Sequence, residues 1–155
     1  MRCVHSILLK KCNFWEAKIP TSCSWVWRKV FQLRYTAQPL IKVNIGNGIS
    51  TSFWYDSWHP LGSLYEAFPV SLLRSIGLTP KSKVADFIKN SGWNWPQELL
   101  SLAKEFKAAT PPALMQHFHR QDCVAWLGSS SGDFSVKSAK KQVGNSGNIV
   151  EWLKL

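Results

Sequence analysis

The chain has 155 residues, of which 45% are hydrophobic and 18% charged, and 19 Lys and Arg against 9 Asp and Glu give a formal charge of +10. This length fits one globular domain, and nine Trp, eight Phe and three Tyr supply enough apolar surface to exclude disorder as the dominant state. No uncharged apolar run reaches about 18 residues, which excludes a membrane-spanning helix, and residues 1–12 make a poor secretory signal.

The first predicted element is a short amphipathic helix between Cys23 and Ala37. Its apolar residues recur near helical spacing, Ser24 is a candidate N-cap, and Pro39 stops the pattern. The next segment, residues 40–45, alternates apolar and polar side chains before Gly46-Asn47-Gly48, and residues 50–54 resume an extended pattern. This arrangement predicts a β-hairpin. Residues 56–64 are rich in turn formers and predict an irregular loop around a buried Trp58.

The rest of the chain predicts more short helices and a second hairpin. The helices cover residues 70–76, 83–89 and 96–109, separated by Gly, Pro and the corner at residues 92–96. The second hairpin would pair residues 123–127 with residues 133–136, and a basic helix is expected over residues 137–143. We therefore expect an α+β fold of short helices with two small antiparallel β-hairpins.

The four cysteines, Cys3, Cys12, Cys23 and Cys123, form neither a CxxC pair nor the dense pattern of a secreted scaffold. We expect reduced thiols in an intracellular protein of the nucleus or cytoplasm. A metal or disulfide site among the first three is the less favoured alternative. His117, His119 and Cys123 could approach one another near one turn, but their spacing is not that of a zinc site, and surface imidazoles are preferred.

Catalytic patterns are weak in this sequence. It has no Asp-Asp or Asp-x-Asp pair for a two-metal polymerase or nuclease, and Asp56 is better explained as an acceptor in a turn. Gly46-Asn47-Gly48 lacks the remainder of a phosphate-binding loop. We therefore expect no catalytic residue, no metal and no cofactor.

The basic residues are concentrated early in the chain. Residues 1–54 carry eight basic side chains and one acidic one, whereas residues 55–155 carry eleven and eight. The candidate nucleic-acid-binding residues are Arg28, Lys29, Arg34 and Lys42. They alternate with aromatic residues that could stack on the bases of a single strand, namely Trp25, Trp27, Phe53, Trp54 and Trp58. The alternative is a Trp-rich core with a solvated basic face.

Several Trp-containing motifs occur in a fixed order along residues 13–155. They are Phe14-Trp15-Glu16-Ala17-Lys18, residues 24–29, residues 45–58, Pro60-Leu61-Gly62, residues 84–88, residues 92–96, Asp122 with Trp126, and residues 132–139. This order resembles plant LINE-type (non-LTR) retrotransposon polyproteins, in the connector that follows the reverse transcriptase domain. Residues 132–139 are similar to the opening of the zinc-binding region in such polyproteins.

The resemblance implies three segments and no polymerase chemistry. Residues 1–22 would be a lead-in left from the segment after the polymerase, residues 23–121 a Trp-rich connector domain, and residues 122–155 the truncated start of the zinc-binding region. The polymerase motif of the Tyr-Ala-Asp-Asp type has no match in this sequence, and the Cys and His ligands of the zinc-binding region would lie beyond Leu155.

The sequence thus predicts a non-catalytic fragment of a reverse transcriptase-like protein with weak, sequence-independent affinity for RNA or DNA. The alternative is a structural or protein-interaction module, or a degenerate and partly folded product, without a nucleic-acid role. In that case we expect apolar surface to remain exposed and to drive self-association.

Overall fold

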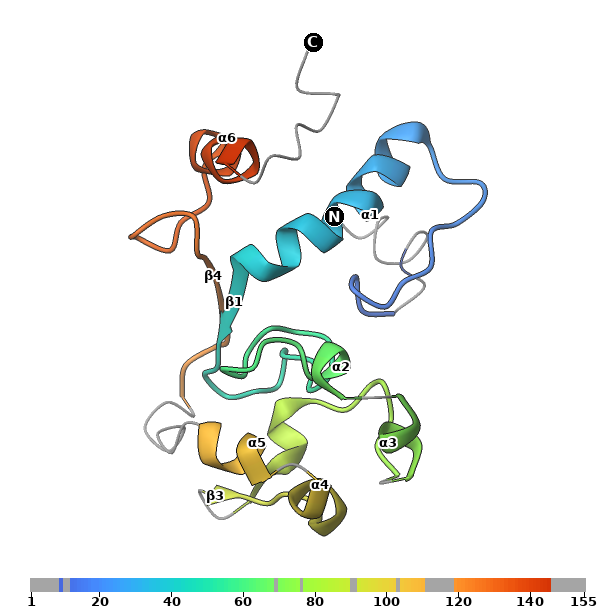
Figure 1. Cartoon of the computed structure of the whole chain (residues 1–155), viewed down its shortest axis with the longest axis vertical. Coiled ribbons are helices and arrows are strands. Elements are labelled where there is room, and N and C mark those ends of the chain that lie inside the picture. Colours follow the sequence, from blue (N-terminus) through green and yellow to red (C-terminus); the bar gives the residue numbers. More distant parts are fainter. Residues whose placement is uncertain are drawn as a thin grey trace.

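A computed structural model describes residue 9 and residues 12–68, 70–75, 77–89, 92–102, 104–110 and 119–145. These residues form short helices and two antiparallel two-stranded sheets, so the predicted α+β class is confirmed. One sheet stands between two groups of helices: α1 and α6 lie on one side of it, and α2 to α5 lie on the other (Figure 1).

Helix α1, Trp25–Ala37, follows the sequence prediction closely. The side chain of Ser24 accepts a hydrogen bond from the backbone N–H of Trp27, as expected of an N-cap. Phe31 on its inner face is fully buried. A short 3-10 turn, Gln38–Leu40, contains Pro39 and delivers the chain directly into strand β1, Ile41–Asn44.

Strand β1 pairs with β4, Cys123–Trp126, and not with the segment that follows it in sequence. The antiparallel register places Ile41 opposite Trp126 and Asn44 opposite Cys123. The predicted hairpin between residues 40–45 and 50–54 is therefore wrong in its second strand. The turn at Gly48 does form, with φ of 70°, but the chain beyond it turns into the core.

Asp122 supplies the physical reason for this difference. Its carboxylate accepts hydrogen bonds from the backbone N–H groups of Gly46 and Gly48 at 2.8 Å and of Ser50 and Thr51 at 3.0 Å, so these donors do not need a strand ladder. The hydroxyl of Ser50 donates a fifth bond at 2.7 Å. Loop 46–51 thus surrounds a carboxylate that belongs to a residue more than 70 positions later.

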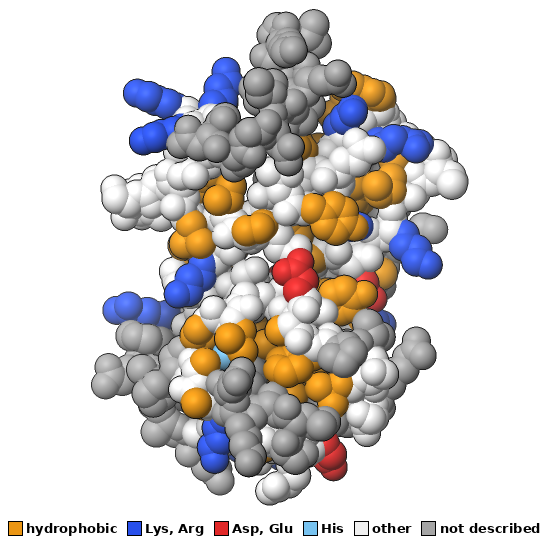
Figure 2. Space-filling view, viewed as in Figure 1, with side chains coloured by type: hydrophobic (Ala, Val, Ile, Leu, Met, Phe, Trp, Pro, Cys, Tyr) orange, Lys and Arg blue, Asp and Glu red, His pale blue; other side chains and the backbone are white. Residues whose placement is uncertain are grey.

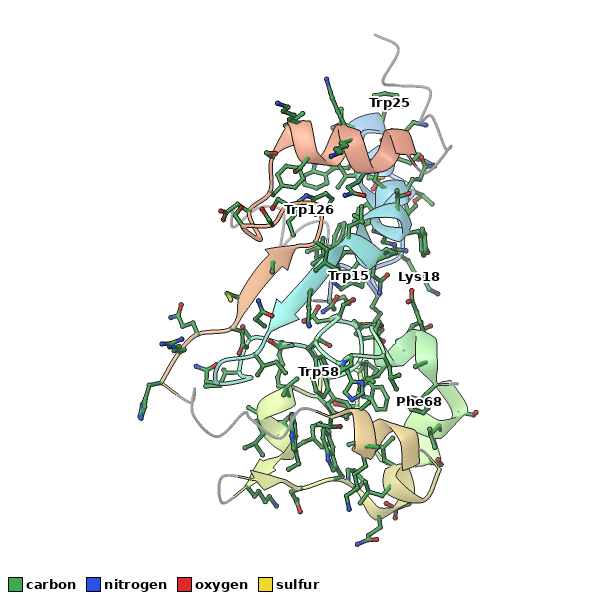
Figure 3. All side chains as sticks on the ribbon, turned by 60° about the vertical axis from the view of Figure 1, so that its left-hand side comes forward. Trp15, Lys18, Trp25, Trp58, Phe68 and Trp126 are labelled. Atoms are coloured by element: carbon green, nitrogen blue, oxygen red, sulfur yellow. The ribbon has the colours of Figure 1, made fainter. Side chains whose placement is uncertain are left out.

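The core is built around the irregular loop that the sequence predicts over residues 56–64. Trp58 is buried, and its indole N–H donates to the carbonyl of Phe53 at 2.8 Å. Trp93 and Trp95 stack on each other at 4.3 Å, and Trp58 stacks on Trp93 at 5.6 Å. Part of this stack comes from the second sheet, the hairpin of β2, Ile88–Lys89, and β3, Gly92–Trp93. Trp58 is labelled in Figure 3, below the two strands of the first sheet in that view.

The remaining helices are short, as the sequence predicts, but the helix predicted over residues 83–89 is wrong: it forms only a 3-10 turn, because residues 88–89 pair with β3 as strand β2. These helices and the turn are α2 (Leu64–Ala67), α3 (Val70–Ser75), the 3-10 turn η3 (Val84–Phe87), α4 (Gln97–Leu102), α5 (Lys104–Ala109) and α6 (Val136–Asn145). The second predicted hairpin forms only its first strand, β4. Residues 133–136, the predicted second strand, do not pair with β4. The chain turns after β4, where the N–H of Trp126 donates to the carbonyl of Gly132, and helix α6 begins at Val136.

Candidate nucleic-acid interface

The first turn of α1 brings an exposed indole and two cations together. Trp25 is 63% exposed, and Arg28 and Lys29 follow it by three and four residues, which places all three on one helix face. The ammonium of Lys29 lies 5.8 Å from the centre of the Trp25 ring. The guanidinium of Arg28 donates to the carbonyl of Thr21 at 3.3 Å, which directs the side chain toward the start of the helix.

Arg34 lies apart from this surface, between α1 and the segment that precedes it. It is 8% exposed. Its guanidinium donates to the carbonyls of Phe14 and Ala17 and, at 3.1 Å, to the hydroxyl of Tyr35. Because these partners tie residues 14–17 to α1, Arg34 holds the preceding segment in place and has little access to a phosphate.

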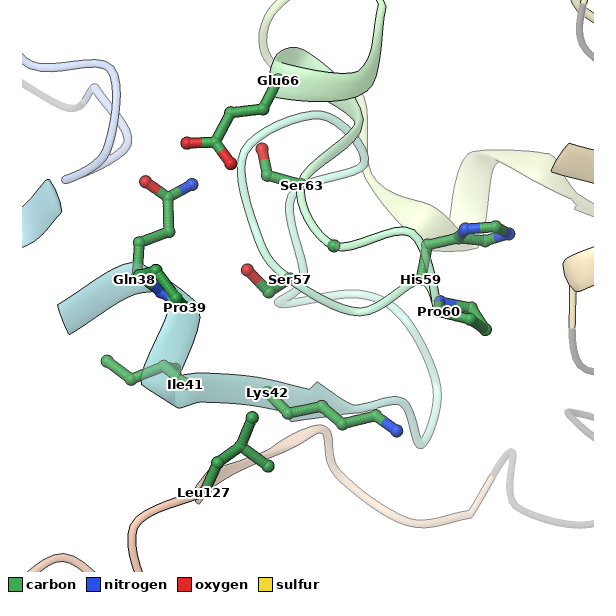
Figure 4. Close-up of a pocket in the computed structure, with 11 residues that line it drawn as sticks. Gln38, Pro39, Ile41, Lys42, Ser57, His59, Pro60, Ser63, Glu66 and Leu127 are labelled. Carbon is green, nitrogen blue, oxygen red and sulfur yellow. The ribbon is translucent and has the colours of Figure 1, made fainter. Parts of the chain in front are cut away.

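Lys42 is exposed, but it lies on β1, beyond the other end of α1. The structure therefore brings two of the four predicted residues, Arg28 and Lys29, onto one helix face, buries a third and places the fourth elsewhere. Lys42 instead lines a pocket beside the sheet (Figure 4).

Most of the aromatic residues proposed to stack on bases lie in the core. Phe53 and Trp54 are fully buried and Trp58 is 3% exposed, so these three rings pack against protein groups. Trp27 is half-buried. Of the five aromatic candidates, Trp25 alone presents a largely open ring, which supports the alternative of a Trp-rich core for the others.

Helix α6 carries a second group of cations, which the candidate residues did not include. Lys137, Lys140 and Lys141 are exposed and follow the i, i+3, i+4 spacing that places them on one face. The hydroxyl of Ser138 accepts the indole N–H of Trp126 at 3.0 Å and so fixes α6 against β4. The sequence shows the helical spacing of these three lysines, but only the structure shows that their helix packs against β4.

Several carboxylates are turned onto the backbone. Asp56 accepts from the N–H of Ser52 at 2.6 Å, which confirms its predicted role as an acceptor in a turn, and Asp86 accepts from the N–H of Lys83 at 2.7 Å. Burial by itself raises the pKa of the Asp122 carboxyl, but the hydrogen bonds from Ser50, Gly48, Thr51 and Gly46 outweigh this effect and lower that pKa to about 2. On the face shown in Figure 2, Lys and Arg side chains lie at the end of the molecule that carries α1 and α6, and the acidic side chains lie near its middle and its other end.

Potential metal ligands are dispersed among the described residues. No group of three or more His, Cys, Asp or Glu side chains converges in that part of the chain. Cys12, Cys23 and Cys123 carry no disulfide bond in the structure. Cys3 and His117, which the sequence suggested as alternative ligands, lie outside the described residues. Within the described ranges, no helix is long and apolar enough to cross a membrane.

Comparison with known proteins gives no match. No protein-family model matches the chain, and neither a curated protein nor a solved structure matches it significantly.

Proposed function

We propose that this chain is a non-catalytic connector of a reverse transcriptase-like retrotransposon polyprotein and that it binds single-stranded RNA or DNA weakly. Its family assignment rests on the ordered Trp motifs of the sequence. The observation that supports binding is the exposed ring of Trp25 beside Arg28 and Lys29 on α1. The lysines of α6 add a second cationic surface.

The physical basis of this binding is electrostatic attraction supplemented by stacking. Exposed Arg and Lys side chains neutralise phosphates and release counterions, a term that does not depend on base sequence. An exposed indole can stack on any base, which contributes about 1–3 kcal/mol per base. Because Trp25 is the one largely exposed ring among the aromatic candidates, we expect low affinity. Because the main attraction is electrostatic, we expect that affinity to fall steeply as the salt concentration rises.

The test is a salt titration of binding to a fluorescently labelled single strand, followed by anisotropy. The triple variant R28A/K29A/K42A should bind more weakly and should lower the slope of log affinity against log salt by about 0.7 for each phosphate that is no longer neutralised. The matched control K81A/K89A/K107A removes the same charge from exposed lysines elsewhere. Absence of binding at low salt, or an equal weakening in the control, would refute the proposal.

The same proposal assigns no polymerase or nuclease chemistry to the chain and places it in the nucleus or cytoplasm. The acidic residues Asp56, Asp86 and Asp122 each bond to their own local backbone or to loop 46–51, which leaves them poorly arranged to share a metal ion. Primer extension by the purified chain should give no product. Any templated extension would overturn this part of the proposal.

A second candidate function, a protein-interaction module, is favoured by one observation. Four apolar side chains on and after β4, those of Val124, Leu127, Phe134 and Val136, are 55–69% exposed. Scattered exposed apolar residues are common, but four within thirteen residues of chain could form part of an interface. Sedimentation velocity over a range of concentrations distinguishes the candidates, because self-association through this surface should be abolished in V124S/L127S and retained in R28A/K29A/K42A.

A further inference from the structure

A pocket of about 450 Å³ lies between the end of α1, strand β1 and the loop that leads into α2 (Figure 4). Its volume falls in the range of pockets that accept small molecules. Its lining combines apolar walls with polar groups from three separate segments. The lining residues used below are Gln38, Pro39, Lys42, His59, Glu66 and Leu127.

Gln38 is the unusual member of this lining. It is 8% exposed, yet its amide makes no hydrogen bond to any described residue, although its backbone groups are bonded in the last turn of α1. The buried polar atoms that lack a partner do not include those of Gln38, so its amide meets solvent in the pocket, and a ligand can replace that water. Figure 4 shows the Gln38 amide directed into the pocket and toward Glu66.

Glu66 and Lys42 give the pocket two ends of opposite charge. Glu66 is exposed on α2, and its carboxylate points back toward Gln38, whereas the Lys42 side chain extends from β1 along the other side (Figure 4). Pro39 and Leu127 contribute apolar surface between them. The pocket therefore offers a side-chain amide, whose oxygen accepts and whose N–H₂ donates, next to a carboxylate, together with an apolar wall and a cation.

His59 also borders the pocket, but its ring is used in the fold. The N–H of Leu61 donates to Nδ1 of His59 at 3.2 Å, which leaves Nε2 as the protonated nitrogen facing the hydroxyl of Thr110 at 3.2 Å. The ring points away from the other lining side chains in Figure 4. Recognition in this pocket therefore depends on Gln38 and Glu66.

We infer that this pocket binds one unstacked nucleobase that carries an exocyclic amino group, with the adjoining phosphate near Lys42. This inference rests on the proposed function, since the base would belong to a bound single strand. An amino group has two N–H donors, which can serve the amide oxygen of Gln38 and the carboxylate of Glu66 together, while the amide N–H₂ donates to a ring nitrogen. Uracil has a carbonyl in place of the amino group, and that oxygen would face the carboxylate.

The experiment compares oligodeoxycytidine with oligodeoxyuridine of equal length, at one salt concentration, by fluorescence anisotropy. The two strands carry the same phosphate charge and differ mainly in the amino group and in the protonation of the neighbouring ring nitrogen. We expect the cytidine strand to bind on the order of tenfold more tightly, the effect of one well-formed pair of base contacts. Because the readout is a ratio, a change of protein charge cancels from it.

The variants Q38L and E66Q should reduce this ratio to near one. Gln38 makes no side-chain hydrogen bond in the fold, so Leu of similar volume should fold normally, which a thermal melt followed by circular dichroism verifies. The control Q32L changes an exposed glutamine of α1 and should keep the wild-type ratio.

Three results would count against the inference. Equal binding of both strands by the wild-type chain would overturn the pocket and leave the proposed function standing. A wild-type ratio in folded Q38L and E66Q would show that the preference arises elsewhere and would also overturn it. Failure of both strands to bind at low salt would refute the proposed function, and the pocket assignment with it.

Discussion

Asp122 should be among the most consequential single residues for stability, because its carboxylate joins β4 to loop 46–51. The variant D122A removes the acceptor of four backbone N–H groups and one hydroxyl. Ser50 is exposed, so water can replace the acceptor there, whereas Gly46, Gly48 and Thr51 are buried. A buried donor left without a partner costs about 1–3 kcal/mol. Because these three hydrogen bonds are only partly buried, the lower end applies, and D122A should lower the free energy of unfolding by about 3 kcal/mol.

The variant D122N separates the charge of this carboxylate from its shape. A pKa lowered from 3.8 to about 2 corresponds to about 2.4 kcal/mol at 1.36 kcal/mol per pKa unit. Because the carboxylate is only partly buried, solvent screening reduces this to about 1–2 kcal/mol. We therefore expect D122N, which keeps one acceptor oxygen, to lose about half as much stability as D122A.

The assay is urea denaturation followed by tryptophan fluorescence, with circular dichroism as a second probe. Asp133 lies on the other side of β4 in sequence and is exposed, so D133A is the matched control and should change stability by less than about 0.5 kcal/mol. If D122A were as stable as D133A, the hydrogen bonds of loop 46–51 would not hold the fold, and this reasoning would be refuted.

The same residue predicts a pH dependence. The pKa of Asp122 is lower in the folded chain than its ordinary value of 3.8, so its contribution is complete above that value and is lost as the pH falls through about 2. The difference in unfolding free energy between the wild-type chain and D122N should thus be constant near neutral pH and should shrink below about pH 4. An unchanged difference at pH 2 would contradict the assignment.

Three further substitutions test the packing, each by denaturation. The indole N–H of Trp54 is buried without a partner, whereas that of Trp58 donates to the carbonyl of Phe53. W58F should therefore lower the free energy of unfolding by about 1–2 kcal/mol more than W54F, and equal losses would contradict this reasoning. R34M removes the hydrogen bonds to the carbonyls of Phe14 and Ala17, so it should lower the free energy of unfolding by about 2–3 kcal/mol. It should leave the slope of log affinity against log salt unchanged, and a reduced slope would show that Arg34 neutralises a phosphate. A Cβ at Gly46 would lie 2.2 Å from the backbone carbonyl oxygen of Arg120, so G46A should cost more than about 2 kcal/mol, and a smaller effect would show that the backbone there can move.

The sequence by itself determined the features that depend on nearby residues. The Ser24 cap and the spacing of apolar side chains placed α1, and turn-forming residues around Trp58 predicted a loop that buries its indole. Asp56 behaves as an acceptor four residues from its donor Ser52. Each of these depends on groups within a few positions, and local propensity therefore carries the information.

Tertiary structure decided the partners of β1, the role of Arg34 and the existence of the Gln38 pocket. A strand exposes the same N–H and C=O groups to any partner, so the alternating pattern of residues 40–45 could not distinguish residues 50–54 from β4. Likewise, a basic residue on a helix shows in sequence only that it is charged, and Arg34 became structural because the carbonyls of Phe14 and Ala17 lie against it. Arg34 bonds to a residue 17 positions away, and the paired residues of β1 and β4 are 79 to 85 positions apart (123 − 44 and 126 − 41), distances at which local patterns carry little information.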